Sequence, residues 1–87
     1  MMAQVVIYTT PYCSYCRAAK ALLSSKNIAF EEIDVSDDPD RRAEMERLSK
    51  RRTVPQVFIN GIAVGGFDNL RRLELTGNLD RLMQQTG

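Results

Sequence analysis

The sequence predicts an α/β fold with a four-stranded mixed sheet, because strand-like and helix-like segments alternate along the chain. The predicted order is strand, helix, strand, helix, two strands and a helix, followed by a short closing helix. Two strands joined by a helix form a parallel, right-handed unit. The two later strands, 56–59 and 62–64, flank Asn60-Gly61, a dipeptide typical of a two-residue hairpin. At least one strand is therefore expected to be antiparallel.

The composition is that of one small globular domain, covering residues 1–87. Apolar residues make up 44% of the chain and charged residues 26%, which argues against disorder. The formal net charge of +1 provides no global field for nucleic acid or a membrane surface. No apolar run approaches the roughly 20 residues that span a bilayer. We expect a monomer.

The N-terminus and the two cysteines favour a cytoplasmic location. Residues 1–4 contain no basic group, and the apolar run at 5–8 is too short for a signal peptide. A disulfide between two cysteines so close in sequence would constrain the unfolded chain little, so a structural disulfide is not expected.

The first half of the chain contains the predicted parallel unit. Residues 4–9 are β-branched and aromatic, which predicts a buried strand that ends before Pro11. Apolar and small residues at helical spacing predict a helix over 14–26. Residues 28–35 alternate only partly but suit a second strand.

A second helix is predicted over 39–50. Asp38 is a suitable N-cap, and Pro39 suits the first helical position. We expect three side chains of this helix to face inward: Ala43, Met45 and Leu48.

Two further helices are predicted after the hairpin. The glycines at 65–66 end the last strand, and a helix follows over 67–75, beginning at the first or second of these residues. Gly77 ends it, and a short closing helix is predicted over 78–85.

Cys13 and Cys16 form the most specific motif of the chain, a Cys-x-x-Cys that follows a strand and opens a helix. Unsatisfied N–H groups and the dipole at a helix start favour a thiolate at Cys13, and the thiolate is the nucleophile in disulfide exchange. One helical turn separates the two residues, which suits a low-strain disulfide. We therefore predict a thiol–disulfide oxidoreductase in which Cys13 attacks and Cys16 resolves.

The alternatives for this pair are half of a metal site or an inert buried pair. Zinc normally takes four ligands, and the chain has neither histidine nor a third cysteine. The lack of histidine also excludes a Cys–His protease. The redox interpretation is therefore preferred.

The segment Thr53-Val54-Pro55 precedes the third predicted strand. Proline cannot donate to a strand ladder, and it holds the preceding residue extended. The free backbone of Val54 could therefore pair with a peptide-like substrate. By itself, the segment is equally consistent with an ordinary proline at a strand start.

Residues 65–69, Gly-Gly-Phe-Asp-Asn, place two glycines before a helix start, an arrangement that accepts anions. Asp68 would cap the helix or bind an ammonium group, although a plain glycine-rich turn is as good an interpretation. Arg51 and Arg52 are candidates for binding carboxylates. Alternatively, they only form the solvated end of the preceding helix. At most one of them is expected to face the site.

These motifs, with Tyr8-Thr9 before the cysteines, resemble the glutaredoxin family over essentially the whole chain. The small bacterial dithiol type is the most similar. The resemblance implies the thioredoxin fold and glutathione-dependent reduction of protein disulfides and glutathione mixed disulfides. It implies that Cys13 is the nucleophile and Cys16 the resolving thiol. Its partners would be glutathione and glutathionylated or disulfide-containing proteins.

The resemblance also implies a glutathione groove. Val54 would bind the cysteinyl backbone beside a cis Pro55, and the turn at 66–69 would hold the γ-glutamyl end. The residues implied for the groove are Tyr15, Arg51, Thr53, Val54, Pro55, Gly66, Phe67, Asp68 and Asn69.

Two positions depart from the family pattern. Thr10 stands where the family usually has a lysine that helps to bind the glycyl carboxylate. Ser14 stands where proline is commonest, and some family members with serine hold a [2Fe–2S] cluster between two subunits through the nucleophilic cysteine of each and two glutathione thiols. A thioredoxin-like reductase is a further alternative, but those proteins usually have tryptophan beside the first cysteine and this chain has none.

Overall fold

The computed structural model describes residues 4–84, which form a four-stranded sheet and four helices. The elements follow in the order β1 (Val5–Thr9), α1 (Ser14–Ser25), β2 (Glu31–Asp34), α2 (Pro39–Ser49), β3 (Gln56–Ile59), β4 (Ile62–Gly65), α3 (Phe67–Thr76) and α4 (Asn78–Gln84). The predicted α/β class and mixed sheet are confirmed. The predicted end of the last helix, residue 85, lies outside the described residues.

The strand order is β2-β1-β3-β4. β1 pairs in parallel with β2 and antiparallel with β3, and β3 pairs antiparallel with β4. Asn60 (φ 52°) and Gly61 (φ 80°) both adopt left-handed conformations, as a type I′ hairpin turn requires. The hairpin prediction is therefore confirmed.

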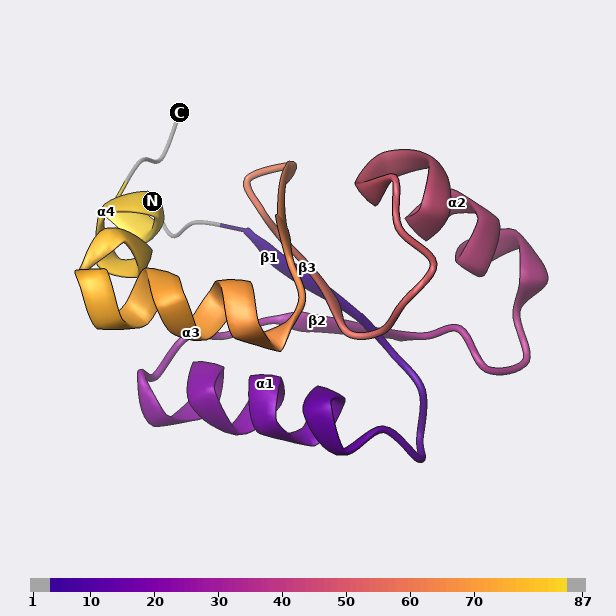
Figure 1. The fold of residues 1–87 in the computed structure, drawn as a ribbon, viewed down its shortest axis with the longest axis horizontal. Helices are drawn as coiled ribbons and strands as arrows, with labels where there is room; N and C mark the ends of the chain where they lie inside the picture. Colours follow the sequence, from indigo (N-terminus) through magenta and orange to yellow (C-terminus); the bar gives the residue numbers. More distant parts are fainter. Residues whose placement is uncertain (1–3, 85–87) are drawn as a thin grey trace.

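The sheet separates two apolar clusters, because successive side chains of a strand point to opposite faces. On one face, Ile7 and Val57 belong to a cluster with buried residues of α1, α3 and α4. On the other face, Tyr8 and Phe58 form a cluster with Met45 of α2. Figure 1 shows the same division, with α1 and α3 on one side of the sheet and α2 on the other.

Two sequence predictions were wrong in detail. The second strand was predicted over 28–35, but β2 begins only at Glu31, where pairing with β1 begins. The apolar residues before Glu31 pack against the core without joining the sheet. Of the three side chains expected to face inward from α2, Met45 is buried, whereas Ala43 and Leu48 are exposed.

The two borders of the sheet differ in charge. β2 carries Glu31, Glu32 and Asp34 along one border. β4 forms the other border and contains no charged residue, and its Ile62 side chain is exposed. Within residues 4–84, no helix is long and apolar enough to cross a membrane.

Candidate active site

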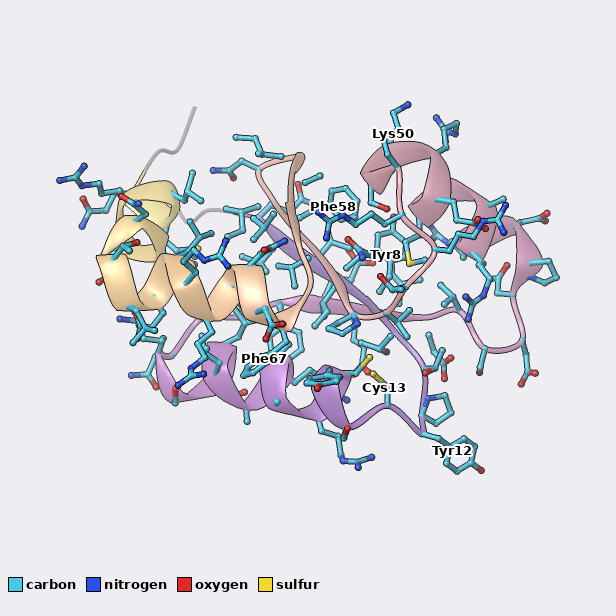
Figure 2. The ribbon with its side chains drawn as sticks, in the orientation of Figure 1. Tyr8, Tyr12, Cys13, Lys50, Phe58 and Phe67 are labelled. Carbon is cyan, nitrogen blue, oxygen red and sulfur yellow. The ribbon has the colours of Figure 1, made fainter. Side chains whose placement is uncertain are left out.

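Cys13 lies at the start of α1, where the chain leaves β1 through a short turn. It is the N-cap of the helix, with extended backbone angles (φ −107°, ψ 112°). Its sulfur accepts a hydrogen bond from the backbone N–H of Cys16 at 3.0 Å. Cys13 as a whole is half-buried, and its sulfur is held at the helix start. Figure 2 shows Cys13 at this position and Tyr12 pointing away from the molecule.

Cys16 lies one turn into α1 and is 1% exposed. Both cysteines are free thiols. Burial, and then the interaction with the Cys13 thiol, raise the pKa of Cys16 to about 12. Cys16 is therefore protonated at neutral pH and is not an attacking thiolate in the reduced state.

The loop before β3 faces the first cysteine. The Cys13 thiol lies 3.7 Å from the carbonyl oxygen of Val54, to which it donates a weak hydrogen bond. The Val54–Pro55 peptide bond is cis, as the family resemblance implied. Among residues 4–84, the backbone N–H of Val54 forms no hydrogen bond. A backbone N–H donor without a partner among the described residues therefore lies beside the reactive sulfur.

The Gly65-Gly66 turn positions the start of α3. Gly65 ends β4 with φ 114°, a conformation that favours glycine, and a Cβ at this position would collide with the Asn69 amide. Gly66 is the N-cap of α3 and provides no side-chain capping bond. The expectation that Asp68 caps the helix is therefore wrong, and Asp68 lies in the first turn of α3. The first N–H groups of α3 remain able to bind an anion.

A pocket of about 390 Å³ lies between these two loops and α1. The structure brings together all nine residues expected to form the groove: Tyr15, Arg51, Thr53, Val54, Pro55, Gly66, Phe67, Asp68 and Asn69. The rings of Tyr15 and Phe67 are 6.2 Å apart, so α1 and α3 meet along one side of the pocket. Figure 2 shows Phe67 at the start of α3, on the same side of the molecule as Cys13.

The charged residues of the pocket come from two elements. Arg51 lies on the loop before β3, whereas Asp68 and Arg72 lie on α3. Arg52 does not line the pocket; its side chain is 90% exposed and forms an ion pair with Glu46 at 3.2 Å. Only one of the two neighbouring arginines thus reaches the pocket, as expected.

Arg72 is a pocket residue that the sequence motifs did not indicate. It lies outside the Gly-Gly-Phe-Asp-Asn segment, four residues after Asp68 and three after Asn69. Residues at these spacings share one face of a helix. The helical spacing between Asp68 and Arg72 was the one feature of the sequence from which this pocket residue could have been predicted.

Comparison with known proteins identifies close relatives. The family model described as Glutaredoxin matches residues 5–64. The chain is 47% identical over 83 residues to glutaredoxin 3 of Escherichia coli (strain K12), a match that covers 95% of this chain and all of that protein.

Solved structures give the same result. The solution structure of glutaredoxin from Brucella melitensis is 52% identical, with a TM-score of 0.84, and the match covers 95% of this chain and 90% of that one. The crystal structure of a buckwheat glutaredoxin–glutathione complex is 27% identical, with a TM-score of 0.86, over 95% of this chain and 78% of that one.

Proposed function

The chain belongs to the glutaredoxin family of glutathione-dependent thiol–disulfide oxidoreductases, and we propose that Cys13 is its nucleophile and Cys16 its resolving thiol. Its sheet and four helices form the thioredoxin fold of that family. The observation that carries the assignment is the Cys13 sulfur at a helix start, 3.7 Å from the Val54 carbonyl and beside the 390 Å³ pocket.

We propose that the pocket binds glutathione. The free N–H of Val54 supports pairing with the cysteinyl backbone of the tripeptide, next to Pro55. The N-terminus of α3 supports binding of the γ-glutamyl end through Gly66, Phe67, Asp68 and Asn69. At the glycyl end of glutathione, Arg51 and Thr53 would help to bind the carboxylate, and Tyr15 would line the groove.

The proposed reaction proceeds by two thiol–disulfide exchanges. The Cys13 thiolate attacks the glutathione sulfur of a mixed disulfide, the old S–S bond breaks, and the substrate leaves as a thiolate that takes up a proton. A second glutathione thiolate then attacks the glutathione sulfur on Cys13 and releases oxidised glutathione. For a protein disulfide, the Cys13 thiolate attacks one substrate sulfur and the other sulfur leaves as a thiolate. Cys16 then loses its proton and attacks the sulfur of Cys13, the bond between Cys13 and the substrate breaks, and the reduced substrate leaves as a disulfide forms between the two cysteines.

The decisive test is turnover of a glutathione mixed disulfide, with glutathione and glutathione reductase recycling the enzyme. We expect NADPH consumption by the wild type and none above background by Cys13→Ser. Activity that depends on thioredoxin reductase rather than on glutathione would indicate the thioredoxin-like alternative. Equal activity of Cys13→Ser and the wild type would contradict the assignment of the nucleophile.

We also propose, as a second role, that two copies of the chain can hold a [2Fe–2S] cluster. Such a cluster takes four thiolate ligands, and the described residues contain no group of three or more metal-ligating side chains. The chain would provide Cys13, which is accessible, and glutathione would provide the remaining thiols. Ser14 in the motif supports this role. Anaerobic reconstitution with iron, sulfide and glutathione should yield a coloured dimer, and a colourless monomer would contradict it.

The location and partners follow from the same chemistry. We propose that the protein acts as a cytoplasmic monomer on glutathionylated or disulfide-containing proteins. The closely spaced, free cysteines suit a reducing compartment, which supports the location. Size-exclusion chromatography of the metal-free protein tests the oligomeric state, and a dimer there would contradict the proposal.

A further inference from the structure

Arg72 lines the pocket but has no role in the function described so far. It lies on the same face of α3 as Asp68 and Asn69, one turn further along. The helix therefore presents a carboxylate, an amide and a guanidinium along one wall of the pocket. Both Arg72 and its neighbour Arg71 are exposed to solvent, but Arg71 does not line this pocket.

The charges of the pocket match those of glutathione. Three lining residues are charged, namely Arg51, Asp68 and Arg72. Glutathione carries two carboxylates and one ammonium group at neutral pH. Asp68 and Arg72 lie together on α3, as the ammonium and carboxylate lie together on the γ-glutamyl residue. Arg51 lies on a different segment, the loop before β3, and would be the partner of the remaining carboxylate.

The guanidinium of Arg72 is available for a ligand. Across residues 4–84, it forms no ion pair and no side-chain hydrogen bond. Lys26 and Arg52, in contrast, are both paired with carboxylates of the chain. Arg72 can therefore bind a carboxylate of the ligand without first breaking an interaction of the protein.

A second hollow borders Arg72 on the side of β4. It has a volume of about 320 Å³, and apart from Arg72 and the Asn69 amide its lining is apolar, with Ile62, Leu73 and Leu82 but no carboxylate. This hollow offers a guanidinium no opposite charge, whereas Asp68 and the N-terminus of α3 line the other one. The charge distribution thus favours the glutathione pocket.

We propose that Arg72 binds the α-carboxylate of the γ-glutamyl residue while Asp68 binds its ammonium group. The inference rests on the proposed function and adds a specificity residue to it. Planar guanidinium groups form paired hydrogen bonds with carboxylates, and the first N–H groups of α3 add to the positive potential there. Arg72 makes the site selective for ligands that retain the γ-glutamyl residue.

The test compares Arg72→Gln with the matched control Arg71→Gln on two substrates. One is a mixed disulfide of glutathione, and the other is the same disulfide made with cysteinylglycine, which lacks the γ-glutamyl residue. For Arg72→Gln, we expect the KM for the glutathione substrate to rise about threefold to fivefold with kcat retained, because the pair is partly exposed to solvent. The KM for the cysteinylglycine substrate should not change, and Arg71→Gln should behave as the wild type does.

Binding of S-methylglutathione, measured by calorimetry, tests the same contact without turnover. We expect Arg72→Gln to weaken its binding by the same factor and Arg72→Lys to restore part of it. An unchanged affinity and KM in Arg72→Gln, or an equal change for both substrates, would overturn the inference. If the wild type binds S-methylglutathione through Arg72 but turns over no mixed disulfide, the proposed function fails while this inference stands. If the wild type does not bind it, both fail.

Discussion

The backbone N–H of Cys16 donates a hydrogen bond of 3.0 Å to the sulfur of Cys13. The two members of the motif therefore interact in two ways: the Cys16 backbone supports the first sulfur, and the Cys16 side chain lies buried within reach of it. The main-chain role and the side-chain role of Cys16 can be separated by substitution.

Replacing Cys16 with serine should leave most of the activity on glutathione mixed disulfides. The substitution removes the resolving thiol but keeps the backbone N–H that faces Cys13. Cys13→Ser should abolish activity, because the hydroxyl is a far weaker nucleophile. The glutathione-coupled assay measures both variants. Loss of activity in Cys16→Ser equal to that in Cys13→Ser would show that resolution by glutathione does not occur.

The buried thiol of Cys16 makes stability depend on alkaline pH. Its pKa rises from the usual 9.0 in the unfolded chain to about 12 in the folded one. The folded state therefore holds this proton more tightly, and the resulting stabilisation is complete below pH 9.0 and lost as the pH rises toward 12. Urea denaturation of the reduced protein at about pH 8 and about pH 11 should show a larger loss for the wild type than for Cys16→Ala. Equal losses would contradict the raised pKa.

Gly65 and Gly66 should respond differently to alanine. At Gly65, alanine must adopt φ 114° and displace the Asn69 side chain, which should cost about 2 kcal/mol or more. At Gly66, φ is −89° and a Cβ would lie 3.5 Å from the carbonyl oxygen of Pro55, an ordinary contact. We expect Gly66→Ala to stay within about 0.5 kcal/mol of the wild type. Thermal denaturation compares the two, and equal effects would contradict the described turn.

Arg51 and Arg52 provide a matched pair for the glycyl end of the groove. Arg51 lines the pocket, whereas Arg52 is paired with Glu46 outside it. Arg51→Gln should raise the KM for a glutathione mixed disulfide about threefold with little change in kcat. Arg52→Gln should leave both constants unchanged. A larger effect of Arg52→Gln would show that the wrong arginine has been assigned to the groove.

Local chemistry made much of the fold and of the groove predictable from sequence. Asn60-Gly61 specified its hairpin because both residues adopt left-handed conformations readily. Asp38 and Pro39 specified the start of α2, where the Asp38 carboxylate accepts a hydrogen bond from the Arg41 N–H at 3.0 Å. The groove residues lie in short motifs that contain glycine, proline or cysteine, whose structural demands can be recognised locally.

The predictions that failed depended on tertiary contacts. Leu48 is apolar and at helical spacing, yet it is exposed because α2 buries only Met45 fully against the sheet. The extent of β2 was set by its pairing with β1, from Val6 to Thr9, and not by the apolar residues that precede it. Arg72 was missed because α3 begins in the Gly-Gly-Phe-Asp-Asn motif but extends beyond it. The helix places Arg72 in the pocket one turn after the motif.

The two edge strands of the sheet differ in charge, so strand pairing between molecules should occur at one edge in preference to the other. A foreign strand that approaches β2 meets a row of carboxylates, which repels acidic chains and favours hydration. At β4, the same strand meets an uncharged, partly apolar ribbon. Polymerisation of crowded or partly unfolded protein should therefore begin at β4, and a lysine in place of Ala63 would be the natural means of suppressing it.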